Sequence, residues 1–191
     1  MASIADWAYR YFGTIDLFAR FNLVDRMDQA EPQTAIVTGA SSGIGLGLTQ
    51  ALLERDWQVV ATSRAISNSK ELKPASNLVL IDGDAGKRET AVKVVETAVK
   101  HFGRIDLLVN NAGIYIPKAF TDYTEEDYNL VMNTNVASFF YMTQQVIPQM
   151  KKQKAGHVVD ISAVVADQPS SGAALAVLSK SPMPAVSKAL A

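Results

Sequence analysis

The sequence predicts an α/β fold in which a doubly wound parallel sheet carries helices on both faces. Two observations support this class. Short apolar, β-branched segments alternate along the chain with longer segments of helical periodicity. The apolar segments also lack the in–out alternation of a half-exposed strand, which is expected when helices cover both faces of a parallel sheet.

The elements follow one another in a regular order. TAIVTG (34–39) is the first expected strand, because it is apolar and β-branched and ends at a glycine. The expected strands are 34–39, 57–63, 77–82, 105–110 and 157–162, and the expected helices are 43–55, 87–101, 124–152 and 173–181. Thr124 serves as the N-cap of a single long helix. Proline is unfavourable inside a helix, so Pro182 should stop or kink the last helix just after Lys180, with a possible restart that places Pro184 in its first turn.

Composition restricts the classes of partner. The 191 residues suffice for one domain with a core. A net charge of −1 and a pI of about 6.1 do not indicate nucleic acid or an anionic membrane, and no apolar run approaches the roughly 20 residues of a membrane span. The chain has no cysteine and two histidines, which excludes thiolate chemistry and argues against a metal site. We expect a cytoplasmic protein.

Residues 1–33 are expected to form a helical extension before the main domain. Trp7, Tyr11, Ile15 and Phe18 recur at helical spacing and could form one face of a short helix. Such a face would dock on the domain or fray, and a membrane surface or a partner helix is the alternative.

The glycine-rich stretch TGASSGIG (38–45) joins the first strand to the first helix of the domain. Glycines let the backbone turn sharply and approach a pyrophosphate, to which the helix N-terminus presents free N–H groups. An ordinary glycine-rich turn is the alternative. The stretch therefore predicts that residues 34–191 bind a dinucleotide, with these contributing residues: Thr38, Gly39, Ser41, Ser42, Gly43, Ile44 and Gly45.

Together with NNAG (110–113), this stretch resembles the short-chain dehydrogenase/reductase family, from about residue 34 to the C-terminus. The resemblance implies a Rossmann-type fold, a nicotinamide cofactor, and hydride exchange with a small alcohol or carbonyl compound. It also implies that Asn111, Ala112 and Gly113 pass under the cofactor and that Asp84 lies beside the adenine ring. A solvated loop acid is the alternative for Asp84.

The end of the second strand indicates which cofactor is bound. An acid there would bind the ribose 2′-hydroxyl of NAD, whereas an arginine suits the 2′-phosphate of NADP. Here Ser63 stands in the acid's place and Arg64 follows it. We therefore expect NADP rather than NAD, with a merely solvated Arg64 as the alternative.

The resemblance further implies a catalytic Tyr, Lys, Ser and Asn. Asn135 matches the Asn better than the nearby Asn133, and Lys180 matches the Lys. Ala163 and Ala176 stand where the Ser and the Tyr are expected. Ser162, one position before Ala163, is a candidate substitute, although strand alternation should point it the other way unless the strand end bends.

Tyr115 and Asp167 are two further candidate proton donors, with packing or solvent exposure as the alternative for each. The leading hypothesis is an NADP(H)-dependent oxidoreductase acting on a small alcohol or carbonyl compound. A non-catalytic NADP-binding protein is the second hypothesis and a partial product is the third. The family's fold continues past the lysine, so we expect a sheet incomplete at its C-terminal edge, and a homo-oligomer through the helix 124–152.

Overall fold

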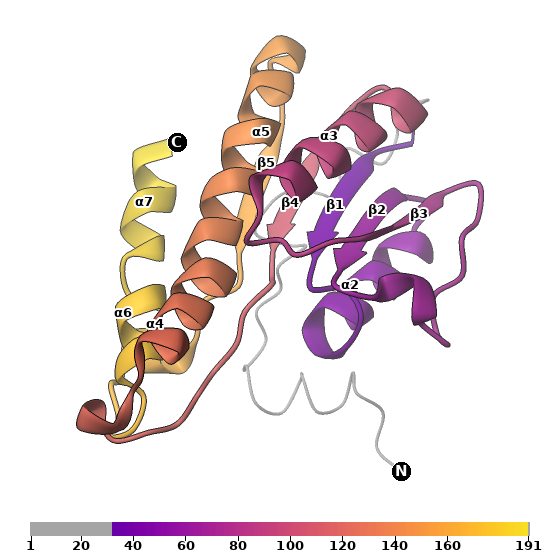
Figure 1. Ribbon diagram of the computed structural model, residues 1–191. Helices are drawn as coiled ribbons and strands as arrows, with labels where there is room; N and C mark the ends of the chain where they lie inside the picture. The colour runs from indigo at the N-terminus through magenta and orange to yellow at the C-terminus, as the bar shows by residue number, and fades with distance from the viewer. Residues whose placement is uncertain (1–31, 191) are drawn as a thin grey trace.

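The computed structural model describes residues 32–190, and within them five parallel strands form one sheet of order β3-β2-β1-β4-β5 (Figure 1). The strands are β1 (Thr34–Thr38), β2 (Gln58–Ser63), β3 (Leu78–Asp82), β4 (Leu107–Asn110) and β5 (His157–Asp160). The chain moves outward from β1 to β3, then crosses back to the other side of β1. This order matches the first five strands of a Rossmann fold and confirms the predicted doubly wound parallel sheet.

Helices cover both faces of the sheet (Figure 1). They are α2 (Gly43–Leu53), α3 (Arg88–Phe102), α4 (Glu125–Met132), α5 (Ser138–Gln153), α6 (Ala174–Lys180) and α7 (Met183–Leu190). Residues of α2 join one hydrophobic cluster, whereas residues of α3 and α5 join the other. Each helix among residues 32–190 is too short or too polar to cross a bilayer.

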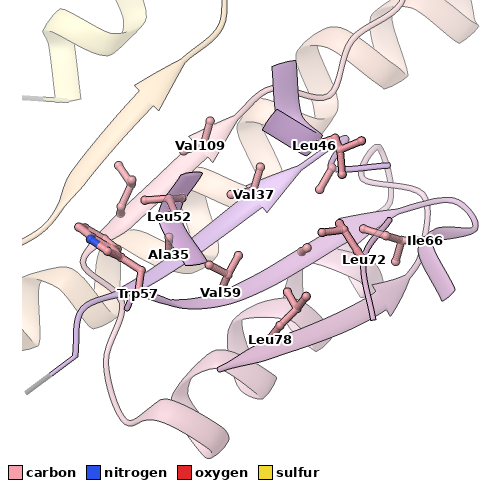
Figure 2. Packing of buried hydrophobic residues seen from close by; sticks show 13 residues of the cluster. Ala35, Val37, Leu46, Leu52, Trp57, Val59, Ile66, Leu72, Leu78 and Val109 are labelled. Atoms are coloured by element: carbon pink, nitrogen blue, oxygen red, sulfur yellow. The ribbon is translucent and has the colours of Figure 1, made fainter. Parts of the chain in front are cut away.

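Strand β1 contributes to both clusters, so each of its residues is buried. Val37 joins the cluster on the α2 side of the sheet, which also contains Leu46 and Leu52 (Figure 2), whereas Ile36 joins the cluster that contains residues of α3 and α5. Full burial of one large apolar side chain stabilises the fold by about 1.5–3 kcal/mol. Burial on both faces is the physical reason why the strand sequences show no in–out alternation.

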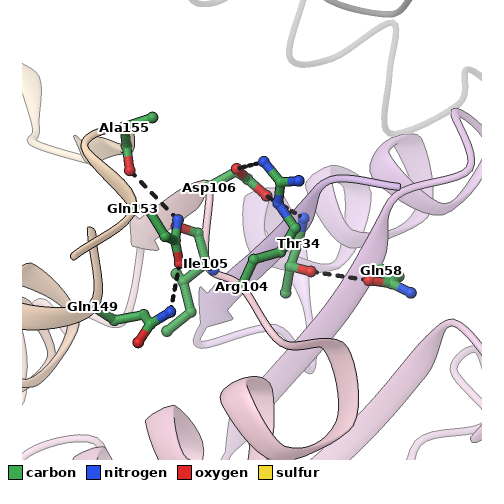
Figure 3. A network of polar contacts seen from close by, with 8 residues as sticks. All are labelled: Thr34, Gln58, Arg104, Ile105, Asp106, Gln149, Gln153 and Ala155. Carbon is green, nitrogen blue, oxygen red and sulfur yellow. Dashed lines mark hydrogen bonds and ion pairs between the residues drawn. The ribbon is translucent and has the colours of Figure 1, made fainter. Parts of the chain in front are cut away.

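Polar contacts fasten the amino-terminal end of the sheet (Figure 3). The carboxylate of Asp106 accepts hydrogen bonds from the backbone N–H of Thr34 at 2.9 Å and from two guanidinium nitrogens of Arg104 at 2.8 Å. The side chain of Gln153, at the end of α5, donates to the carbonyl of Ile105 and accepts from its N–H, both at 2.9 Å. These contacts do not involve the opposite edge of the sheet, at the carboxyl ends of the strands.

The expected long helix 124–152 differs from the structure in its middle. Thr124 forms the predicted N-cap, in a capping box with Asp127. Between α4 and α5, however, residues Asn133–Ala137 form a π-helical segment. Such wider turns are frequently found at functional sites, and Asn135 lies within this one.

The C-terminal helices follow the proline prediction. Helix α6 ends at Lys180, and α7 begins at Met183 with Pro184 in its first turn. The predicted stop and restart are therefore confirmed. The predicted helical extension, residues 1–33, lies outside the described residues except for Pro32 and Gln33.

Candidate functional site

A cleft of about 840 Å³ runs along the carboxyl ends of the strands. All strands are parallel, so the loops that follow them meet at this one edge of the sheet. The lining contains these residues singled out from the sequence: Gly39, Ser41, Ser42, Ile44, Arg64, Asp84, Asn111, Ala112, Gly113, Asn135, Ser162 and Lys180. The volume lies within the roughly 300–1,000 Å³ typical of small-molecule sites.

The loop after β1 leads into the N-terminus of α2. Gly39 and Gly43 have φ angles of 65° and 56°, in the left-handed region that glycine adopts without strain. The N-cap residue of α2, Ser42, makes no side-chain capping bond, and the first turn of α2 carries no acid. Helix N–H groups without a side-chain cap, beside a cleft lined by Ser41 and Ser42, fit a phosphate group.

Asn111 holds this loop from behind. Its side-chain amide donates to the carbonyls of Thr38 at 2.8 Å and Gly39 at 3.2 Å. The hydroxyl of Thr38 accepts from the N–H groups of Asn111 and Ala112, both at 3.0 Å. A Cβ on Gly45 would lie 2.4 Å from the Asn111 amide nitrogen. Thr38 and Gly45, like Gly43, therefore shape the loop without lining the cleft.

The β2 and β3 end of the cleft presents Arg64, which is exposed, together with Ser63 and Asp84. Asp84 accepts a hydrogen bond from the N–H of Gly86 at 2.9 Å. The nearby Asp82 does not line the cleft. Its carboxylate accepts from the side chain and the backbone N–H of Ser67, and these hydrogen bonds lower the pKa of Asp82.

Asn135 connects the other end of the cleft to α6. Its side chain is 1% exposed, and its oxygen accepts from the N–H of Ile114 at 2.8 Å. Its amide nitrogen donates to the carbonyl of Ile114 at 3.1 Å and to the hydroxyl of Ser179 at 2.9 Å. Asn135 thus fixes the backbone after β4 against α6.

Lys180 lies at the same end, next in sequence to Ser179. Its ammonium donates to the carbonyl of Ile161 at 2.9 Å, and a Cβ on Gly113 would lie 3.4 Å from its nitrogen. Burial lowers the pKa of Lys180, and the negative charge of Asp160 acts in the opposite direction. The cleft therefore holds a largely buried amine between the loops that follow β4 and β5.

The alanine positions also lie in the cleft. Ser162 and Ala163 both line it, because β5 ends at Asp160 and strand alternation no longer governs where they point. Ala176 lines the cleft one helical turn before Lys180. Of the other candidate donors, Tyr115 lines the cleft and Asp167 does not.

Three groups around Lys180 are not among the residues singled out from the sequence. The carbonyl of Ile161 has no sequence signal, since every residue has one. Ser179 directly precedes Lys180, and the motif that identifies the lysine assigns no role to this serine. Asp160 did carry a signal, because it is an acid at the end of an apolar strand, although it does not line the cleft.

The comparisons with known proteins agree with this geometry. A family model described as short chain dehydrogenase matches residues 33–191. The 3-oxoacyl-(acyl-carrier-protein) reductase FabG of Thermotoga maritima is 37% identical over 140 residues, which are 71% of this chain and 57% of that protein.

Solved structures are similar as well. A short-chain dehydrogenase from Streptomyces avermitilis superimposes with a TM-score of 0.79 at 28% identity, over 84% of this chain and 60% of that one. A 3-ketoacyl-(acyl-carrier-protein) reductase from Brucella melitensis, complexed with NADH, has a TM-score of 0.79 at 27% identity, over 85% and 70% of the two chains. The chain spans little more than half the length of the curated reductase it matches. It belongs to the short-chain dehydrogenase family.

Proposed function

We propose that this chain binds NADP(H) in the cleft and exchanges hydride with a small alcohol or carbonyl compound. The observation that carries the proposal is that one cleft joins the uncapped N-terminus of α2 to the buried amine of Lys180. Similarity to reductases, one of them solved with NADH, supports the same reaction class. When bound, the nicotinamide ring supplies or accepts the hydride.

The residues present fit such a cofactor along its length. The N–H groups of α2 and the hydroxyls of Ser41 and Ser42 would hold the pyrophosphate. Asp84 would lie at the adenine end, and the backbone of residues 111–113 would support the nicotinamide end. Lys180 would donate a hydrogen bond to the nicotinamide ribose.

We further propose a preference for NADP over NAD. Arg64 would pair with the 2′-phosphate in a charge-assisted contact. Ser63 puts no carboxylate beside that phosphate. Asp82 lies outside the cleft lining, and its carboxylate already accepts hydrogen bonds from Ser67.

A second candidate is a non-catalytic NADP-binding protein, and Ala163 and Ala176 are the observation that favours it. An alanine cannot donate a proton, and general acid–base catalysis contributes roughly 10²–10⁴-fold to rate. Tyr115, in the cleft wall, is the phenol that could supply a proton instead.

Turnover by the wild-type chain separates these candidates, and the double variant Ala163→Ser/Ala176→Tyr tests whether the rest of the site can support the reaction. We expect NADPH oxidation with a panel of small ketones to rise by roughly 10²–10⁴-fold over the wild-type chain, since an acid and an oxyanion donor are restored. Leu178→Tyr is the matched control, because Leu178 is 51% exposed and does not line the cleft. Equal rates in the double variant and this control would contradict the proposed reaction. Loss of wild-type turnover in Tyr115→Phe would identify Tyr115 as the acid.

We also propose self-association through the helical segment 124–152. Tyr128 and Phe140 are 45% and 52% exposed on it, and a partner surface would remove this apolar area from water. Light scattering should show an oligomer that Phe140→Asp dissociates. An unchanged mass in that variant would exclude this surface.

A further inference from the structure

Asp160 is fixed by three elements at the end of β5. One carboxylate oxygen accepts from the side-chain amide of Asn110 at 2.8 Å, and the other accepts from the hydroxyl of Ser187 in α7. The same Asn110 amide donates to the hydroxyl of Thr143 in α5 at 3.0 Å. Both partners of the carboxylate are neutral, so the network fixes the position of Asp160 without neutralising its charge.

This charge lies next to the site of Lys180. The ammonium of Lys180 donates to the carbonyl of Ile161, the residue that follows Asp160. Lys180 is 7% exposed, and removal of an ammonium group from water disfavours its charged form. A nearby carboxylate favours the charged form and offsets that cost.

Other charged or titratable groups also lie on the elements around α6 and β5. They are Tyr115 in the cleft wall, Glu125, Glu126, Asp127 and Tyr128 of α4, His157 of β5, Asp167 after the 3-10 turn Val164–Ala166, and Lys188 of α7. Asp127 is paired with Lys118. Within residues 32–190, Asp160 is the charged group that acts on the pKa of Lys180, and it acts against the effect of burial.

We propose that Asp160 is a positioning residue of the site, whose carboxylate, fixed by Asn110 and Ser187, keeps Lys180 in its ammonium form. The role of this ammonium as a hydrogen-bond donor to the cofactor rests on the function proposed above. The inference also connects α7 to the cleft, because Ser187 helps to hold the carboxylate.

The variant Asp160→Asn tests this with almost no change of shape. The new amide can still accept from Asn110, and it can donate to Ser187, whose hydroxyl proton is then free to bond the carbonyl of Met183 at 2.9 Å. The first readout needs no cofactor. The rate of Lys180 acetylation by acetic anhydride is followed against pH by peptide mass spectrometry, with the exposed Lys188 as internal reference. We expect Lys180 to become reactive at lower pH in Asp160→Asn than in the wild type.

Two control variants separate charge from packing. Asp56→Asn removes one acid from the exposed turn before β2, at the opposite end of the sheet, where a φ of 60° suits asparagine. Ser187→Ala removes the link to α7 but keeps the carboxylate. Asp56→Asn should leave the pH profile of Lys180 acetylation unchanged, whereas Ser187→Ala should shift it by less than Asp160→Asn does. Coincident profiles in Asp160→Asn and the wild type would overturn the proposal.

The second readout is the affinity for NADPH as a function of pH. In Asp160→Asn, the loss of affinity at alkaline pH should begin at a lower pH than in the wild type. If the wild-type chain binds no NADPH at any pH, the proposed function fails, and the acetylation profile still decides the role of Asp160.

Discussion

Replacement of Gly45 with alanine would disturb the close packing of this glycine against Asn111 and Gly39 in the glycine-rich loop. A Cβ at this position would lie 2.4 Å from the side-chain nitrogen of Asn111 and 2.5 Å from the carbonyl oxygen of Gly39. The carbonyl belongs to the backbone, so it cannot rotate away as a flexible side chain could. Gly47, two residues later in the same helix, is a matched control, since a Cβ there would meet no atom within 4 Å.

The magnitude follows from the comparison of the two variants. Alanine is favoured over glycine in a helix by about 1 kcal/mol, and this gain is common to both positions. Overpacking in a tight site costs typically about 1–3 kcal/mol, and it applies to Gly45→Ala alone. We therefore expect Gly47→Ala to raise the free energy of unfolding. The free energy of unfolding of this variant should be about 1–3 kcal/mol higher than that of Gly45→Ala.

Urea unfolding followed by far-ultraviolet circular dichroism measures this difference. With a slope of about 1–3 kcal/mol per molar urea, the two midpoints should differ by about 1 M. Gly45→Ala should also weaken NADPH binding, because Asn111 and Gly39 must move apart, whereas Gly47→Ala should leave it unchanged. Equal midpoints with unchanged binding in both variants would refute the steric reasoning.

Three other outcomes follow from the structure. Arg64→Ala should reduce the ratio of NADH to NADPH dissociation constants measured by fluorescence titration, and an unchanged ratio would exclude Arg64 as the phosphate partner. Burial holds the pKa of Lys180 below 10.5, so between its folded value and 10.5 the unfolded chain binds more protons. The free energy of unfolding should therefore gain a contribution that rises with pH in this window. Lys180→Met should remove it in urea titrations at several alkaline pH values, and parallel curves for the two proteins would contradict the assignment. Trp57→Ala, at a side chain 6% exposed, should lower the free energy of unfolding by about 3–5 kcal/mol, and a loss below 1 kcal/mol would contradict its place in the core.

Much of the fold could be predicted because its signals are local. Ile36 and Val37 are neighbours that enter opposite clusters, and this two-sided burial is visible as an uninterrupted apolar strand. Pro182 follows the end of α6 because proline has no backbone N–H to donate and its ring clashes with the preceding helical turn. The π-helical segment around Asn135 was not predicted, because it accompanies contacts with Ile114 and Ser179, the latter 44 residues away in sequence.

The site was predictable to the same extent. The glycine loop and Lys180 were recognisable from motifs, and the structure brings both to one cleft. The orientation of Ser162 was not, because it depends on where β5 ends rather than on alternation. Asp160 and Ser187 are 27 positions apart in sequence, so their contact could be predicted only once the position of α7 was known.

Titration of the 191-residue chain with NADPH, followed by nicotinamide fluorescence, tests the central claim most directly. We predict saturable binding that is tighter for NADPH than for NADH, and that is weakened by Lys180→Met at the far end of the cleft from Arg64. A folded chain that binds neither nucleotide would contradict the assignment of this cleft as a dinucleotide site.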